Sequence, residues 1–157
     1  MDSAFEKAKK ALTIKSVNLR SSNIFLDYNM EPFELEKLNL ETQTFRGVQK
    51  FKEISMQSEG QSWWEYNFFY AVGIRLVNET NDDSKEGDSE ESPLLQIMAT
   101  FNALYRADEK LDNDVLEAFS EQNVGYHVWP YWRELVQSSC ARLNVSTLEV
   151  PFYFCMQ

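Results

Sequence analysis

The sequence predicts an α+β fold with an antiparallel sheet. Segments with strand-like alternation fill the first part of the chain, and two helical patterns follow them. Two long alternating segments, 63–77 and 93–106, flank a polar stretch, which indicates a hairpin. Strands in a run followed by helices are typical of α+β proteins. Because 157 residues suit one core, we expect a single domain over 1–157.

The N-terminal part predicts a short helix followed by strands. Residues 3–12 have the helical pattern. Alternation over residues 12–28 indicates two strands, or one long bent strand. Residues 30–47 satisfy neither period, so we expect a loop that could include an extended piece. Residues 48–58 return to strand spacing.

The segment 63–77 has the clearest strand pattern in the chain. Its large apolar side chains recur at every second position, with small or polar residues between them. Such alternation is typical of an antiparallel strand with one buried face, and 93–106 repeats it. The run 78–92 between these segments is acidic, with one lysine and no apolar side chain. We expect it to be a mobile hairpin loop.

Two helices and an extended tail are predicted for the C-terminal part. Residues 113–121 have helical spacing and acids near their start. Gly125 is expected to separate them from a longer helix, whose apolar stripe covers 128–143 and whose first turn would contain Pro130. The segment 146–154 is expected to be a terminal edge strand or an extended tail.

The acidic composition excludes several classes of partner. A formal net charge of −10 leaves no basic footprint for nucleic acid and would be repelled by an anionic membrane. No apolar run approaches the ~20 residues of a membrane helix, and the N-terminus lacks a signal peptide pattern. Cys140 and Cys155 are too few for a disulfide framework. We therefore expect a cytoplasmic protein without nucleic acid and without direct membrane insertion.

The sequence offers little catalytic or metal-binding chemistry. One histidine, His127, and two distant cysteines cannot form a zinc site of ordinary spacing. His127 could serve as a general base, but a partly exposed residue at a helix start is the favoured interpretation. Single, scattered glycines form no phosphate-binding loop. We expect no enzyme activity, no metal and no cofactor.

An excess of apolar and aromatic side chains is the most unusual feature of the sequence. Aromatic residues make up 14% of the chain, more than one small core needs. Two explanations remain open: the extra faces pair with another copy of the chain, or they also form an apolar groove for foreign peptide. The pattern alone favours self-association.

The segment 126–143 resembles the SecB family of protein-export chaperones. Its WPYWRE stretch at 129–134 is similar to the aromatic-Pro-Tyr-x-Arg-Glu motif with which a long helix opens in that family. Leu148 and Pro151 resemble the Leu-x-Pro stretch that follows, with one additional residue between them. Residues 13–19 resemble the family's first strand, and the length and acidity of the chain also agree.

The resemblance implies a four-stranded antiparallel sheet with a long C-terminal helix packed on one side. It also implies a homotetramer, built as a dimer of dimers, that binds unfolded polypeptides or preproteins in apolar grooves without ATP. The implied partners are unfolded clients and the SecA motor. The alternative is a dedicated chaperone or adaptor for one specific partner, because SecB-like proteins also serve toxin–antitoxin systems, where the client is an antitoxin.

Candidate site residues follow from the resemblance and the apolar pattern, which do not separate groove from core. The peptide-binding candidates are Ile54, Met56, Phe68, Tyr70, Leu95 and Phe101. The candidates for the oligomer interface lie on the long helix and are Trp129, Tyr131, Trp132, Leu135, Val136 and Cys140. Positions where the family uses acids to dock SecA resemble Ser16, Arg20 and Met98 here, which argues against general preprotein export.

Overall fold

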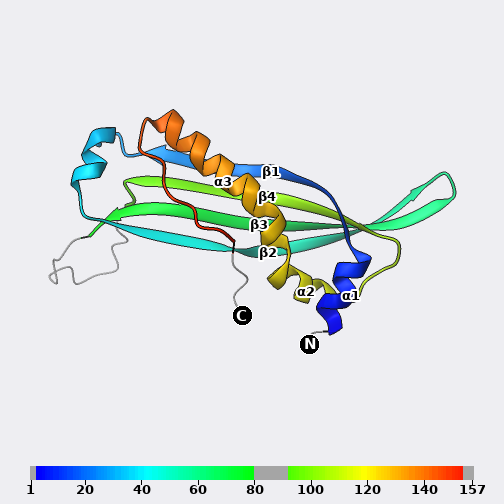
Figure 1. Cartoon of the computed structure of the whole chain (residues 1–157). Helices are drawn as coiled ribbons and strands as arrows, with labels where there is room; N and C mark the ends of the chain where they lie inside the picture. The colour runs from blue at the N-terminus through cyan, green and yellow to red at the C-terminus, as the bar shows by residue number, and fades with distance from the viewer. Residues whose placement is uncertain (1–2, 80–91, 154–157) are drawn as a thin grey trace.

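The computed structural model describes residues 3–79 and 92–153, and its centre is a four-stranded antiparallel sheet crossed on one face by a long helix (Figure 1). The strands, in the sheet order β1-β4-β3-β2, are β1 (Thr13–Leu26), β2 (Leu40–Ser58), β3 (Gln61–Asn78) and β4 (Leu95–Ala107). The helices are α1 (Ser3–Ala11), the 3-10 helix η1 (Pro32–Lys37), α2 (Asn113–Gln122) and α3 (Val124–Leu143). The predicted fold class is confirmed.

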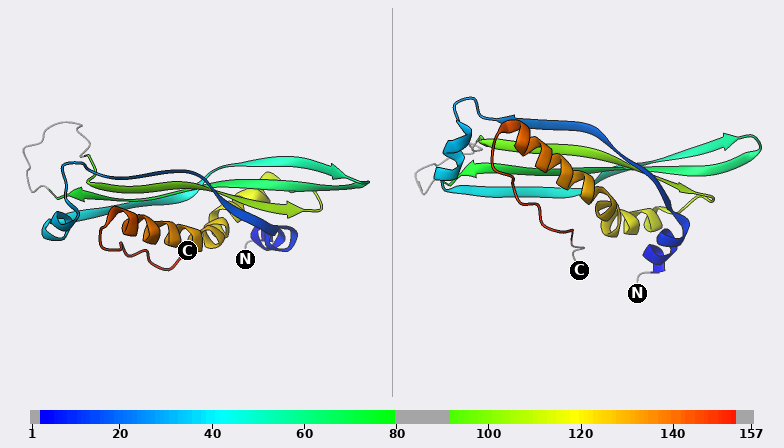
Figure 2. Two further views of the ribbon diagram at one scale, coloured as in Figure 1. Left: turned by 90° about the horizontal axis from the view of Figure 1, so that it is seen from above. Right: turned by 45° about the horizontal axis from the view of Figure 1, so that its top comes forward.

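The β3–β4 hairpin forms the middle of the sheet and gives it two different faces. In β4, every second residue from Leu95 to Ala107 is buried, as the alternation predicts. The helix face, under α3, carries Phe68 and Phe101; we call the opposite face, which carries Phe69 and Asn102, the open face. No described helix crosses the open face (Figure 2). The predicted loop 78–92 falls mostly on residues 80–91, which lie outside the described residues.

The two edge strands differ most from the sequence prediction. Residues 13–26 form one continuous strand, β1, with irregularities after Ile14 and after Leu19 that bend it. Of the two predicted alternatives, two strands or one long bent strand, the second is confirmed. In the ambiguous segment 30–47, η1 comes first and β2 then begins at Leu40, earlier than the predicted 48.

The boundary between the C-terminal helices also differs from the prediction. The break lies at Asn123, so Gly125 belongs to the first turn of α3, and Pro130 lies beyond that turn. Gly125 is required for packing rather than for a break: a Cβ there would lie 2.6 Å from the Tyr70 hydroxyl. Pro130 is tolerated because it removes only one helical hydrogen bond, the one to the carbonyl of the exposed Tyr126.

The residues after α3 form an extended tail that runs back along the helix (Figure 1). Asn144 ends α3 in the left-handed conformation, with φ of 59°. Residues 145–153 contain no strand, so of the two predicted alternatives the extended tail is confirmed. The part of the chain that is described contains no helix that is both long and apolar enough to cross a membrane.

Candidate peptide-binding groove

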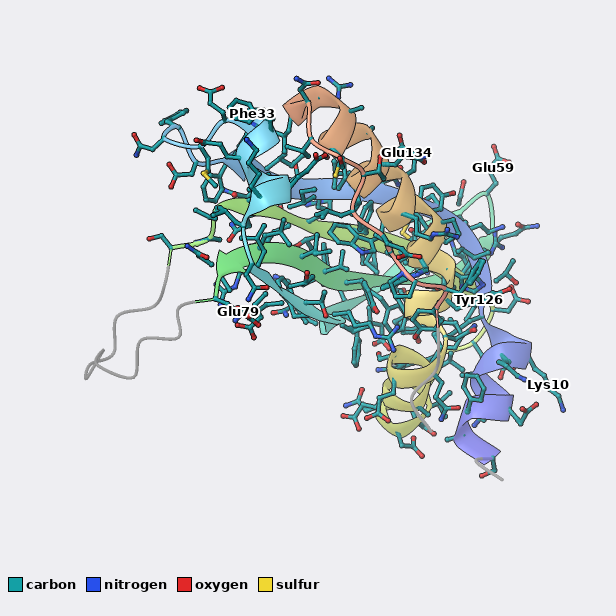
Figure 3. All side chains as sticks on the ribbon, turned by 60° about the vertical axis from the view of Figure 1, so that its left-hand side comes forward. Lys10, Phe33, Glu59, Glu79, Tyr126 and Glu134 are labelled. Atoms are coloured by element: carbon teal, nitrogen blue, oxygen red, sulfur yellow. The ribbon has the colours of Figure 1, made fainter. Side chains whose placement is uncertain are left out.

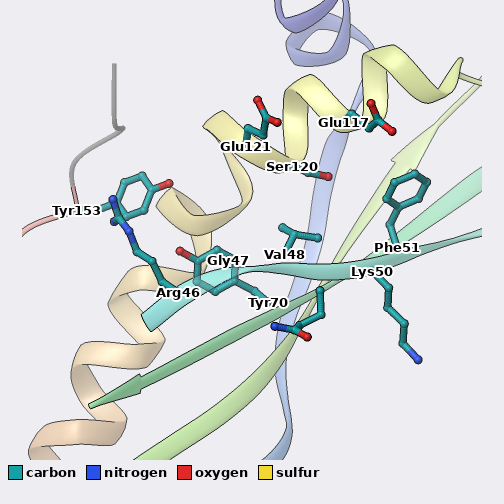
Figure 4. Close-up of a pocket in the computed structure, with 11 residues that line it drawn as sticks. Arg46, Gly47, Val48, Lys50, Phe51, Tyr70, Glu117, Ser120, Glu121 and Tyr153 are labelled. Atoms are coloured by element: carbon teal, nitrogen blue, oxygen red, sulfur yellow. The ribbon is translucent and has the colours of Figure 1, made fainter. Parts of the chain in front are cut away.

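Two hollows follow one another along β2 on the helix face. The first lies between β2 and α2, has a volume of about 730 Å³ and is lined by Val48, Phe51, Tyr70 and Glu117, among others (Figure 4). The second lies between β2, α3 and the tail, has a volume of about 580 Å³ and is mainly apolar. Arg46 lines both hollows, so they form one groove that is narrowed at this side chain.

Arg46 lies in an aromatic cluster at the narrow point of the groove. Its guanidinium carbon is 4.6 Å from the ring centre of Tyr153 and 5.4 Å from that of Trp129. The two rings are themselves 5.4 Å apart. Cation–π attraction therefore fixes the end of the tail to β2 and α3 at this point.

The tail forms one wall of the second hollow as an extended chain. Val150, Pro151 and Phe152 line it, and the Trp129 indole Nε1 donates a hydrogen bond of 2.7 Å to the carbonyl of Pro151. The guanidinium of Arg133 lies 4.9 Å from the Phe152 ring centre. The groove thus recognises an extended backbone by one indole donor and its side chains by apolar and cation–π contacts.

β2 also offers backbone groups at one edge of the sheet. It pairs with β3 only, so no described strand covers its outer edge. Unpaired strand edges accept extended peptides as additional strands. The groove therefore combines apolar side-chain contacts with a row of main-chain donors and acceptors.

The structure disperses the six predicted peptide-binding residues. Phe68, Leu95 and Phe101 are buried between the sheet and the helices. Tyr70 is also buried, but it lines the first hollow. Ile54 and Met56 lie on the open face, opposite Glu65 and Trp63 of β3, and Ile54 is 41% exposed.

The six residues predicted for an oligomer interface separate into two groups along α3. Trp132, Val136 and Cys140 are buried against the sheet of their own chain, and Trp129 is buried by the tail. Tyr131 is 49% exposed and Leu135 is partly exposed. Tyr126 and Glu134 also project from the outer side of α3 (Figure 3). On the helix face of β1, Leu19 and Ile24 remain exposed.

Sequence reasoning did not identify Arg46, Val48, Trp129 and Tyr153 as groove residues. Arg46 lies in the segment 30–47, whose apolar residues follow neither the helix nor the strand period. Trp129 is predicted to lie in an oligomer interface instead. For Trp129 and Tyr153, the signal in the sequence is that aromatic residues stand on both sides of the turn expected after the long helix.

Two buried tyrosines form hydrogen bonds between the sheet and the segments that pack on it, outside both hollows. The Tyr66 hydroxyl donates to Oε2 of Glu53 at 3.0 Å and accepts from the Leu111 N–H at 2.8 Å. Burial, together with the Glu53 carboxylate, raises the pKa of Tyr66 to about 12. The Tyr105 hydroxyl lies 2.9 Å from Nδ1 of His127, and burial raises the pKa of Tyr105 as well.

His127 is expected to make the fold less stable in mild acid. Burial lowers its pKa below the ordinary value of about 6.5, so the folded protein favours neutral imidazole. The unfolded chain therefore binds this proton more readily, and stability falls as the pH drops below about 6.5 towards the lower folded pKa. Urea unfolding midpoints measured across this range should fall with acidity. The unfolding midpoint of His127→Gln should fall less steeply with acidity than that of the wild-type protein. An equal fall in both proteins would contradict this role of His127.

The described residues contain no group of three or more His, Cys, Asp or Glu side chains placed to hold a metal ion. Cys140 is buried and reduced, and Cys155 lies outside the described residues. His127 and Tyr105 pair beneath α3 and do not line either hollow of the groove. What the groove offers is binding surface: an indole donor, a guanidinium, aromatic rings and a strand edge.

The fold is similar to that of a solved SecB-like chaperone. This structure is the SecB-like chaperone Rv1957 of Mycobacterium tuberculosis, solved in complex with a ChAD peptide from the HigA1 antitoxin Rv1956. The match has a TM-score of 0.64 and 13% identity and covers 96% of both chains. No protein-family model and no curated protein matches the sequence. At this identity the likeness establishes a shared fold.

Proposed function

We propose that the protein is an ATP-independent holdase that binds extended segments of unfolded polypeptides in the groove along β2. The tail carries this proposal, because it lies extended along the second hollow with the Pro151 carbonyl bound by the Trp129 indole. A foreign segment of similar apolar character would find the same donor and rings. Aromatic surfaces suit varied clients because they give large contact area without strict hydrogen-bond geometry.

The second candidate function is that of a dedicated chaperone for one partner, such as an antitoxin. The observation that favours it is the matched Mycobacterium chaperone, which was solved with an antitoxin peptide. The open face gives a further argument, since Ser16, Arg20 and Met98 lie on it and supply no acids for SecA. Both candidates use the same groove and differ in client range.

The proposed assembly is a cytoplasmic homotetramer of a single domain spanning 1–157. Apolar surface is exposed on α3 by Tyr131 and Leu135. It is also exposed on the helix face of β1 by Leu19 and Ile24. Burying such surface against other copies would remove it from water. Size exclusion with light scattering tests this assembly, and a monomer would contradict it.

Aggregation suppression tests the holdase and separates it from the dedicated chaperone. Chemically denatured proteins of unrelated sequence are diluted into buffer with the protein in slight excess and without ATP. Suppression for several of them is expected. Suppression confined to one partner would favour the dedicated chaperone. If the protein is folded but suppresses no aggregation of any client, the holdase proposal is contradicted.

Val48→Asp places a charge in the first hollow and should weaken suppression, so that about tenfold more protein is needed. Ile54→Asp makes the same kind of change on the open face and is the matched control. It should leave suppression unchanged. The reverse result, with loss only in Ile54→Asp, would place client binding on the open face instead.

A further inference from the structure

The open face carries a cluster of cations that converge on one ring. The Nζ atoms of Lys50 and Lys52 lie 5.3 and 5.5 Å from the ring centre of Phe69, and the guanidinium carbon of Arg20 lies 5.6 Å from it. Arg20 comes from β1 and reaches across β4, whereas both lysines come from β2. Farther along the same face, the guanidinium carbon of Arg106 lies 4.5 Å from the ring centre of Trp63.

These cations are held in place by aromatic rings, and one of them, Arg106, lies directly opposite Glu65 on the neighbouring strand. None of the four forms an ion pair with a described carboxylate. Glu65 is the one carboxylate between them on the open face, and its Oε1 accepts from the Trp63 indole at 3.3 Å. The net charge of the chain is −10, so a basic surface here opposes the overall composition. Cation–π contacts restrain the long side chains, which lowers the entropy lost when they bind an anion.

A shallow hollow of about 370 Å³ lies next to this cluster. Its rim includes the hydroxyls of Ser21 and Thr100 and the amides of Asn23 and Gln49. The Ala71–Thr100 pair that lines it lies two residues along the strands from the Phe69–Asn102 pair. Neutral donors thus stand beside the cations, in a position to bind main-chain or side-chain oxygens.

We propose that the open face is a second binding surface, which docks an acidic, extended segment of a protein partner. Lys50 and Lys52 are two residues apart on one strand and therefore about 7 Å apart along it. Alternate carboxylates of an extended acidic segment have the same spacing. Arg20 adds a third cation from the opposite edge, so the cluster matches carboxylates along one short segment.

The charge of the surface favours a protein segment over nucleic acid. Four cations in a chain of net charge −10 are few for a phosphate backbone, whose binding scales with the number of phosphates neutralised. The surface lies on the opposite face of the sheet from the groove, and the two meet at the edge strand β2, where Lys50 borders the first hollow. Docking here would leave the second hollow free, so one protein could hold a client and an acidic partner together.

Fluorescence anisotropy with a labelled Glu-Ala repeat peptide tests this surface without any unfolded client. The wild-type protein should bind it, with affinity falling in added salt, and should ignore the matching Gln-Ala peptide. Lys50→Glu/Lys52→Glu should weaken binding by about tenfold or more, because exposed charges act together across this short patch. Lys7→Glu/Lys10→Glu on α1 (Figure 3) gives the same charge change and should alter binding less than about twofold.

Three outcomes would overturn the proposal. Equal losses in the two variants would mean that only overall charge attracts the peptide. Tighter binding of a single-stranded oligonucleotide, lost in Lys50→Glu/Lys52→Glu, would make this a nucleic-acid surface. A smaller assembly by light scattering in that variant alone would mean that another copy covers the face. Circular dichroism of both variants confirms that they are folded.

Discussion

Replacing Phe119 by alanine is expected to lower the free energy of unfolding by about 3–5 kcal/mol. Phe119 of α2 is 1% exposed and packs between two aromatic rings of the sheet. Its ring centre lies 4.9 Å from that of Tyr105, edge to face, and 5.7 Å from that of Phe68. The substitution removes the ring and leaves a cavity that rigid strands cannot fill. Since domains of this size are stable by only about 5–15 kcal/mol, the loss is large.

Phe33→Ala is the matched control, because Phe33 on η1 is 60% exposed (Figure 3). Its ring contacts the Lys37 ammonium and no aromatic ring of the core, so its loss should cost less than about 1 kcal/mol. Urea unfolding followed by circular dichroism measures both variants. Similar midpoints for the two would mean that α2 does not hold the sheet as the packing indicates.

The central hairpin could be predicted because each of its strands has one buried face. In β4 burial alternates residue by residue as the pattern predicts, whereas in β3 all residues from Phe68 to Ile74 are buried, because the residues between those of the helix face are covered as well. β2 is an edge strand whose residues 41–45 are mostly exposed on both faces, so burial leaves no period in the sequence. For this reason the sequence predicts only a loop that could include an extended piece for the first half of β2.

Residues on the same face of a strand belong to the core or to the groove depending on which element packs above them. Phe68 and Tyr70 share the helix face of β3, but Phe119 covers Phe68 whereas Tyr70 borders the first hollow. The same holds along α3, where Trp132 faces the sheet and Tyr131 faces outward. Periodicity identifies the apolar face, but the division into core and groove depends on the placement of α2 and of the tail.

Pro130 shows a further limit of local rules. Helix propensity places proline in a first turn, and the sequence therefore predicts that the long helix begins just before Pro130. Tertiary packing overrides this preference: Val124 and Val128, before Pro130, are buried, so the helix gains by extending towards α2. The cost of one lost hydrogen bond is smaller than the gain from two buried valines.

Releasing the tail is expected to increase affinity for unfolded polypeptide by about tenfold. If the tail and the client compete for one groove, the apparent affinity is reduced by the fraction of molecules with the tail bound. Tyr153→Ala removes the ring that contacts Arg46 and Trp129. These aromatic and cation–π contacts contribute about 1–2 kcal/mol, which gives the expected change. Binding of a labelled, permanently unfolded protein measures it.

Trp129→Phe separates release of the tail from loss of the Tyr153 ring as a groove surface. It keeps an aromatic ring on α3 but removes the Nε1 donor that Pro151 uses and that a client would also use, so the tail and the client each lose one hydrogen bond and affinity should change less than in Tyr153→Ala. Tyr28→Ala, at a fully exposed tyrosine, should change nothing. A decrease in affinity in Tyr153→Ala would show that the ring binds clients rather than excluding them. Unchanged affinity in both groove variants would mean that clients bind elsewhere, since a competing tail cannot be weakened without effect on its competitor.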